Sequence, residues 1–190
     1  MMAWHFGAEK MRDGRDFPPD GVKLVYNGQL VMCESGLHAS ERIIDALQYA
    51  PGNTIFRVEC GGKIECDTDK IVCTERTILW RIDGEKVLQE FARWCALEVL
   101  HLWNASEIIV RHLKTGDENI RAAAGDAAWS AAEDAAWSAA RSAARVAAWA
   151  AAWATAGDAA RVAAWAAAWA TQNAKLTAMV EEAHNRMVPA

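Results

Sequence analysis

The chain has 190 residues, enough for one ordinary domain and an appendage, and its 20 Lys and Arg against 25 Asp and Glu give a formal net charge of −5. No cluster of Lys and Arg occurs, which argues against a nucleic-acid-binding protein that works by neutralising phosphates. Composition divides the chain near Gly116: an ordinary mixed sequence precedes it, and a biased, repetitive segment over 117–175 follows.

The N-terminal segment, MMAWHFGAEKMRDGRD, lacks the apolar core of a signal peptide. We therefore expect a cytoplasmic protein. Free thiols are the default state of cysteines in that compartment. The five cysteines, odd in number and irregularly spaced, are accordingly expected to be free.

Short apolar runs bounded by Gly, Pro and Asn dominate residues 1–83 and predict strands of an antiparallel or mixed sheet: AWHF, VKLVY, LVMC, TIFRVEC, KIEC, KIVC and TILWRI. The clearest hairpin joins TIFRVEC to KIECD, with Gly61-Gly62 suited to a tight turn that needs positive φ. One helix interrupts the strands. Ser40 is its expected N-cap, and Pro51-Gly52 ends it.

Two helices are expected after the sheet. Asp83 can cap the first, over 85–103, and Asn104 the second, over 105–114. Thr115-Gly116-Asp117 then predicts a stop followed by a new start. The first helix carries one apolar face, made of Val87, Leu88, Phe91, Cys95, Val99 and Leu102. Residues 1–115 are therefore predicted to form an α+β head domain.

From Arg121 the sequence falls into groups of four residues whose third and fourth positions are almost always Ala. The first position holds every Trp of the segment, and RVAAWAAAWAT occurs twice, at 145–155 and 161–171. Ala is the best helix former because it loses no side-chain entropy, so we expect 121–172 to be helical. Four residues advance an α-helix by about 400°, so the groups drift around it in the sense that favours a right-handed supercoil.

A lone helix cannot bury six indoles, so we expect this helix to assemble copies of the chain into a homo-oligomer. A helical hairpin is the alternative, because Gly157 can end one helix and Asp158 can cap the next. A membrane span is disfavoured, since Arg145, Asp158 and Arg161 interrupt every 18-residue window that might span a bilayer. The expected oligomerisation residues are Trp129, Trp137, Trp149, Trp153, Trp165 and Trp169.

The segment CESGLHAS, at 33–40, lies between an expected strand and an expected helix N-terminus. Polar side chains converge there beside backbone N–H groups suited to an anion. The alternative is a structural turn, in which Gly36 makes the turn, His38 satisfies a local backbone partner and Ser40 caps the helix. The candidate ligand-binding residues are Glu34, Ser35, Gly36, His38 and Ser40, together with His5.

Two chemistries at the cysteines are weaker alternatives. A zinc site can be drawn with four ligands: Cys33, His38, Cys60 and Cys66. However, no C-x-x-C spacing occurs, and cysteines in strands are usually small core residues. A nucleophile formed by Cys33 or Cys73 with His38 is equally generic. We therefore predict no metal, no cofactor and no catalytic residue.

The segments CESGLHAS, DALQYA, FRVECGGKI and DKIVCTERTIL resemble an uncharacterised domain of phage and prophage proteins that carries the pattern C-x-x-G-[LF]-H-A-[SC]. QEFARWCALEVLHLW, at 89–103, and the alanine-rich groups of four at 121–172 are similar to segments of some relatives. The resemblance implies a phage-type protein located in the cytoplasm of the host. It implies no particular activity.

A second resemblance, at the level of the fold, is to ADP-ribosyltransferase-like domains, which also place a G-L-x-x-S turn before a helix. This resemblance implies that His5, Ser40 and either Glu59 or Glu65 handle a dinucleotide. The H-G-T or R-G sequence of those enzymes is missing here, because Phe6-Gly7 follow His5.

We interpret the chain as a phage-type accessory protein. Its α+β head, over 1–115, is expected to have a small, mostly antiparallel sheet with packed helices, followed over 116–190 by a long helix or helical hairpin that oligomerises. The head is expected to capture a small anionic, nucleotide-like ligand or a host protein without catalysis, for instance in counter-defence. The alternatives are an ADP-ribosyltransferase-like enzyme and a purely structural assembly protein. No nucleic-acid or membrane partner is expected.

Overall fold

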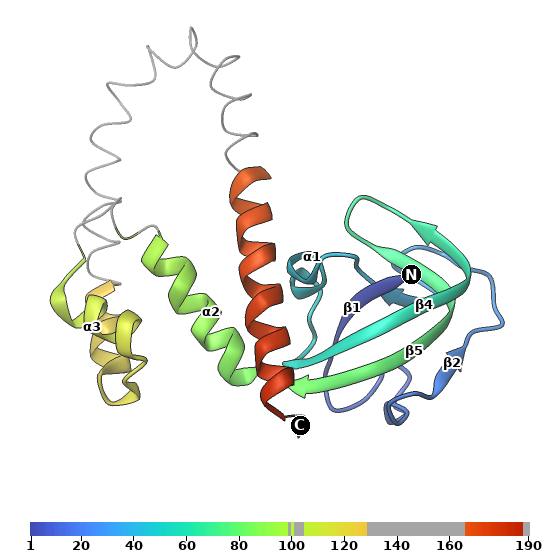
Figure 1. The fold of residues 1–190 in the computed structure, drawn as a ribbon, viewed down its shortest axis with the longest axis horizontal. Helices are drawn as coiled ribbons and strands as arrows, with labels where there is room; N and C mark the ends of the chain where they lie inside the picture. The colour runs from blue at the N-terminus through green and yellow to red at the C-terminus, as the bar shows by residue number, and fades with distance from the viewer. Residues whose placement is uncertain (99, 101–104, 129–165, 188–190) are drawn as a thin grey trace, which may run out of the picture. The chain divides into compact units, whose positions relative to one another are not determined.

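The computed structural model describes residues 1–98, 100, 105–128 and 166–187 (Figure 1). The chain divides into two compact units, Met1–Gln89 with Thr171–Ala190, and Glu90–Ala170. The sequence predicts a domain boundary between residues 115 and 116. The segment on its C-terminal side contains residues 129–165, which lie outside the described residues, so this boundary stays a prediction.

The first unit is built on an antiparallel sheet, which confirms the predicted α+β class with a small antiparallel sheet. Four strands follow one another across the sheet in the order β1-β4-β5-β2, and β3 also pairs with β5. Every pairing is antiparallel. The strands are β1 (Met2–Gly7), β2 (Lys23–Val25), β3 (Leu37–Ala39), β4 (Thr54–Cys66) and β5 (Ile71–Asp83).

The two long strands form a hairpin whose turn is not at the expected place. β4 runs without a break through Gly61-Gly62, and the turn lies at 67–70, where the Asp67 N–H donates to the Lys70 carbonyl at 2.9 Å. Gly62 instead forms a bulge: it has φ +65°, and together with Lys63 it opposes Thr74 alone. The predicted positive φ is confirmed at Gly62, but this residue lies in a bulge and not in a turn.

A second bulge, at Leu79, divides the side chains of β5 between the two faces of the sheet. Arg57 pairs with Trp80 and Val58 pairs with Ile78, so Leu79 is an extra residue. Ile78 and Trp80 therefore point to opposite faces, although alternate residues of a regular strand share a face. We call these the Ile78 face and the Trp80 face.

The Ile78 face carries a buried cluster against which Phe17, Leu37 and Ile64 pack. The cluster consists of Ala3, Ala39, Phe56, Val58, Cys60, Ile71, Cys73 and Ile78. On the Trp80 face, the Trp4 and Trp80 rings meet edge to face with centroids 5.6 Å apart. Alternating apolar residues in the strands thus supply both layers of the core.

The short helix α1 (Ile43–Gln48) begins two residues later than expected. Its N-cap is Arg42, which makes no side-chain capping bond, so the prediction that Ser40 caps this helix was wrong. The backbone N–H and carbonyl of Ser40 both bond to Trp4, at 2.9 and 2.8 Å. Ser40 therefore extends the strand pairing, and its backbone is already used there.

Of the two helices that follow the sheet, the first begins as predicted and the second does not. α2 (Glu85–Glu98) starts where the Asp83 carboxylate accepts from the Glu85 N–H at 3.0 Å. α3 (Glu107–Thr115) has Ser106 as its N-cap, and Ala105 is not helical, so the prediction that Asn104 caps a helix over 105–114 was wrong. Gly116 ends α3 with φ +67°, and Asp117 caps the 3₁₀ helix η2 (Glu118–Ile120), which confirms the predicted stop and new start.

A C-terminal helix over 166–187 belongs to the first unit from Thr171 onwards (Figure 1, red). The Ile44 N–H of α1 donates to the Asn173 side-chain oxygen at 3.3 Å. Leu176 and Val180 are fully buried. Burial of these residues at i and i+4 places one apolar stripe of the helix against the first unit.

Both described ends of the repeat, 121–128 and 166–172, are helical. The choice between a continuous helix and a hairpin at Gly157-Asp158 lies outside the described residues. So do five of the six expected oligomerisation residues, Trp129, Trp137, Trp149, Trp153 and Trp165. The sixth, Trp169, is half-buried in the C-terminal helix. Within the described residues, no helix combines the length and apolarity needed to cross a membrane.

Candidate functional site

A buried arginine lies at the centre of the Ile78 face. Arg76 of β5 pairs with Cys60 of β4, and only 4% of its surface is exposed. One guanidinium nitrogen, Nη1, donates to the His38 backbone oxygen at 2.5 Å, whereas Nε has no hydrogen-bond partner. No carboxylate among the described residues pairs with this cation. Burial accordingly lowers the Arg76 pKa.

His5 of β1 lies on the same face, because it pairs with Phe56. Its ring lies between two aromatic rings, with centroids 6.1 Å from Phe17 and 5.8 Å from Phe56. The ring also hydrogen-bonds to the His38 backbone. Burial, followed by the charges of Arg76 and His38, lowers the His5 pKa well below its usual value. His5 is therefore a neutral imidazole at neutral pH.

The CESGLHAS segment forms a tight loop that leads into β3. Cys33 and Gly36 both have positive φ, +66° and +116°. The Cys33 N–H donates to Nε2 of His38 at 3.0 Å, and the His38 ring also bonds to the Gly36 backbone. Burial, and then the charge of Arg12, lowers the His38 pKa. The imidazole of His38 is thus engaged within its own loop, as in the structural-turn alternative.

The six predicted ligand-binding residues are only partly brought together. His5 and Arg76 meet at the His38 backbone carbonyl, whereas the side chains of His38, which pairs with Val72, and of Ser40, which pairs with Trp4, point to the opposite face of the sheet. Ser35 donates its hydroxyl to the Gln29 carbonyl at 2.7 Å, and Glu34 is exposed. The cationic centre of the group, Arg76, was not among the predicted residues.

Two thiols complete the cluster around Arg76. Cys60 and Cys73 are 1% and 0% exposed, and their side chains hydrogen-bond to each other. The Cys73 thiol also donates to the Glu75 carbonyl at 3.0 Å and to the Leu37 carbonyl at 3.3 Å. The bond from Cys60, and then the charge of Arg76, lower the Cys73 pKa against the effect of burial. The pKa of Cys60 is raised.

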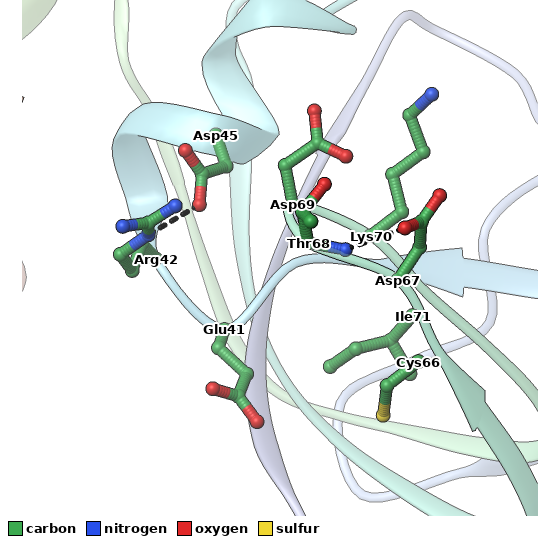
Figure 2. Close-up of a pocket in the computed structure, with 9 residues that line it drawn as sticks. All are labelled: Glu41, Arg42, Asp45, Cys66, Asp67, Thr68, Asp69, Lys70 and Ile71. Carbon is green, nitrogen blue, oxygen red and sulfur yellow. Dashed lines mark hydrogen bonds and ion pairs between the residues drawn. The ribbon is translucent and has the colours of Figure 1, made fainter. Parts of the chain in front are cut away.

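A polar hollow of about 280 Å³ lies between α1 and the β4–β5 turn (Figure 2). Its charges are largely paired at short range: Arg42 bonds to Asp45 at 2.5 Å, and Asp69 accepts from the Tyr49 hydroxyl at 2.6 Å. Lys70 lies over the Tyr49 ring, 4.3 Å from its centroid. No predicted ligand-binding residue lines this hollow, whose walls are Glu41, Arg42, Asp45, Cys66, Asp67, Thr68, Asp69, Lys70 and Ile71.

A second, more open hollow of about 300 Å³ lies on the Trp80 face against the C-terminal helix. Arg57 lies 4.4 Å above the Trp4 ring, and His184 stacks on Trp80. The charge of Glu181 partly offsets the effect of burial on the Arg57 pKa, which is lowered. The wall residues are Met2, Arg57, Trp80, Glu181, His184 and Asn185.

The residues that the resemblance to ADP-ribosyltransferase-like domains implies for dinucleotide binding do not lie together on one face of the sheet. Glu59 pairs with Met2, three positions from the pairing of His5 with Phe56. Since successive pairs alternate between faces, Glu59 and His5 point to opposite sides of the sheet. Glu65 forms an ion pair with Lys63 at 2.7 Å.

No zinc site is assembled within the described residues. Cys33 is an exposed loop residue whose sulfur accepts from Lys70 at 3.2 Å, whereas Cys60 is buried beside Cys73. No group of three or more His, Cys, Asp and Glu side chains in this part of the chain is arranged to hold a metal ion.

The fold and the cluster together define an α+β head with a buried, unpaired cation on one face of its sheet. Residues 1–90 match the model of a family described as Domain of unknown function (DUF7666). No curated protein matches the chain. No solved structure matches it either.

Proposed function

We propose that the head is a binding module for a small, nucleotide-like anion, which it binds without catalysis. The single observation that carries the proposal is the Arg76 guanidinium, which is buried, lacks a carboxylate partner and has a free Nε–H. Transferring a charged group out of water costs several kcal/mol unless an opposite charge compensates it. An oxyanion at Nε supplies both the missing charge and the missing acceptor.

The surroundings of Arg76 favour a ligand of this kind. His5 is neutral, so it contributes a hydrogen-bond donor or acceptor without adding a second charge. Its bond to the His38 backbone holds the ring beside the guanidinium. The aromatic rings of Phe17 and Phe56, whose centroids are 4.6 Å apart, border the His5 ring and hold it in place.

We further propose that the repeat at 121–172 joins several heads into a homo-oligomer. The support is the sequence pattern, in which six tryptophans occupy first positions among alanines. Oligomerisation places several anion sites on one particle. The resemblance to phage and prophage proteins adds a role in the host cytoplasm, such as the sequestering of a nucleotide signal.

The proposal is tested by native mass spectrometry of the full chain purified from cells. We expect an anion to be retained by the natural protein and lost from Arg76→Gln. The matched control is Arg81→Gln, because Arg81 lies on the same strand but is ion-paired with Asp20 at 2.6 Å. Retention by Arg76→Gln, or no anion on the natural protein after addition of phosphate and AMP, would contradict the proposal.

The same preparation distinguishes binding from catalysis. Incubation with NAD is expected to leave the dinucleotide intact, because Glu59 and His5 lie on opposite faces of the sheet. Release of nicotinamide would favour the ADP-ribosyltransferase-like enzyme instead.

A further inference from the structure

The hollow of about 300 Å³ on the Trp80 face carries charges of opposite sign on its two walls. Arg57 of β4 lies on the wall that the sheet forms, and Glu181 lies on the wall that the C-terminal helix forms. Both walls belong to the first unit. We propose that this hollow binds a free α-amino acid with an apolar side chain, such as leucine. The site lies on the other face of the sheet from Arg76 and does not depend on anion binding there.

Two tryptophans hold the cation of the hollow. Arg57 pairs with Trp4 of β1 and with Trp80 of β5, so the three residues form a row across the sheet. The guanidinium lies over the Trp4 ring, 4.4 Å from its centroid. An aromatic face fixes an arginine in position and leaves its N–H groups available. These groups bind a carboxylate with two parallel hydrogen bonds.

The two charges of the hollow are not paired with neighbouring side chains. Among the described residues, the Arg57 guanidinium makes one hydrogen bond, from Nη1 to the Ala3 carbonyl at 3.4 Å, and forms no ion pair. Glu181 forms neither a hydrogen bond nor an ion pair in that part of the chain, although its charge acts on Arg57. An α-amino acid carries a carboxylate and an ammonium on the same carbon. One small molecule therefore supplies a partner to each charge.

The C-terminal helix changes from apolar to polar where it reaches the hollow. Leu176 and Val180 are fully buried, whereas the following turn lines the hollow with Glu181, His184 and Asn185. These three residues are three and four positions apart, so they share one face of the helix. The His184 ring is used in its stack on the sheet. The Asn185 amide offers the ligand a further donor and acceptor.

The size and the remaining walls of the hollow favour an amino acid with an aliphatic side chain. A volume of about 300 Å³ is at the lower end of the range for small-molecule pockets, which suits a single amino acid better than a nucleotide. Met2 and Trp80 supply the apolar surface. A methionine side chain adapts to the shape of its neighbours, so it can cover the side chain of leucine.

Two derivatives of leucine separate the contributions of the two charges. N-acetyl-leucine lacks the ammonium, and leucinamide lacks the carboxylate. Isothermal titration calorimetry of the full chain measures the dissociation constant of each compound. We expect leucine to bind and each derivative to bind at least about tenfold more weakly. Leucinamide that binds as tightly as leucine would indicate a peptide N-terminus, and N-acetyl-leucine that does so would indicate a peptide C-terminus. Either result would contradict a site for a free amino acid.

Variants locate the site in the hollow. Arg57→Gln should weaken leucine binding about tenfold but leave leucinamide binding unchanged, because leucinamide has no carboxylate to lose a partner. Glu181→Gln should likewise weaken leucine binding and leave N-acetyl-leucine binding unchanged. The matched control is Glu182→Gln, because Glu182 forms an exposed ion pair with Arg186 at 3.4 Å and does not line the hollow.

The test does not depend on the folding of the Arg57 variant, since Glu181 is an exposed helix residue whose replacement leaves the core intact. Circular dichroism of each variant checks the fold. Leucine that does not bind to the natural protein, or that binds to Glu181→Gln as tightly as to Glu182→Gln, would overturn the proposal.

Discussion

His184 of the C-terminal helix stacks on Trp80 of β5, with ring centroids 4.1 Å apart and planes inclined by 16°. Trp80 reaches this position because the bulge at Leu79 turns it away from the face that carries Ile78. The extra residue Leu79 thus places Trp80 on the face of the sheet where the C-terminal helix packs. The contact joins parts of the first unit that lie more than a hundred positions apart in sequence.

Removal of this stack should loosen the C-terminal helix. His184→Ala is expected to lower the free energy of unfolding by about 1 kcal/mol, the usual size of an aromatic pair contribution beyond area burial. Arg186→Ala is the control, because its ion pair with Glu182 is exposed. Urea denaturation followed by circular dichroism measures both variants. Equal stability of the two would show that the stack contributes nothing.

The two adjacent glycines of β4 should respond differently to the same substitution. A Cβ on Gly62 would lie 2.1 Å from the Thr74 hydroxyl, at a residue with φ +65°. A Cβ on Gly61 would meet nothing closer than 3.5 Å. We expect Gly62→Ala to destabilise the protein by about 1–3 kcal/mol and Gly61→Ala to change stability little. Thermal melts of both variants check this, and equal melting temperatures would refute the bulge assignment.

Stability should fall on mild acidification because of His5. The pKa of His5 in the folded chain lies well below the unfolded value of 6.5, so the unfolded state binds more protons between the two values. The contribution of His5 to the free energy of unfolding is therefore greatest above pH 6.5. It decreases as the pH falls toward the folded pKa, by up to about 1.4 kcal/mol per pH unit. His38 acts in the same direction.

Replacement of His5 by Gln should reduce this slope, since Gln does not titrate. Urea melts of both proteins at intervals between pH 8 and pH 4.5 supply the comparison, and pH 8 is the reference at which His5 is neutral. An unchanged slope in His5→Gln would mean that other groups cause the acid sensitivity.

The tryptophans of the repeat are expected to hold copies of the chain together. Truncating an interface Trp costs about 2–4 kcal/mol. Replacement of Trp149, Trp153, Trp165 and Trp169 by Ala should therefore dissociate the oligomer, while helicity stays high because Ala favours helices. Light scattering gives the mass and circular dichroism gives the helicity. A mass that does not fall would exclude these residues from the interface.

The class of the fold and several helix ends could be predicted from local sequence. Asp83 and the Thr115-Gly116-Asp117 segment act through bonds between residues two to four positions apart, so the local sequence contains both partners. Short apolar runs indicated the strands for the same reason. The hairpin turn was misplaced because Gly62 meets its requirement for positive φ in a bulge opposite Thr74, which lies on the other strand.

The candidate site was harder to predict, because its centre depends on pairings between distant strands. His5 and His38 were identified by residue type, but Arg76 is an ordinary strand residue in TERTILW. One local signal was available: Arg76 and Ile78 are alternate residues, so an inward Ile78 implies an inward Arg76. That inference needs the face of Ile78 to be known, and the bulge at Leu79 removes the regular alternation that would reveal it.

The proposed anion site predicts that removal of the Arg76 charge stabilises the protein. Arg76→Met keeps an apolar side chain of similar length in the core but deletes a buried charge that has no carboxylate partner. Without an added anion, we expect this variant to melt at a higher temperature than the natural protein, because the desolvation penalty of the guanidinium is gone. The hydrogen bond from the charged Nη1 to the His38 carbonyl offsets about 1.5–3 kcal/mol of this gain, less than the several kcal/mol of the desolvation penalty.

The most direct test is therefore a thermal melt of the natural protein and Arg76→Met, each with and without AMP or inorganic phosphate. Binding at about a hundred times the dissociation constant adds about 2.7 kcal/mol to the stability of the natural protein, a rise in melting temperature of several degrees. We predict that rise in the natural protein and none in Arg76→Met. An Arg76→Met protein that melts lower than the natural one and is stabilised equally by the anion would contradict the account.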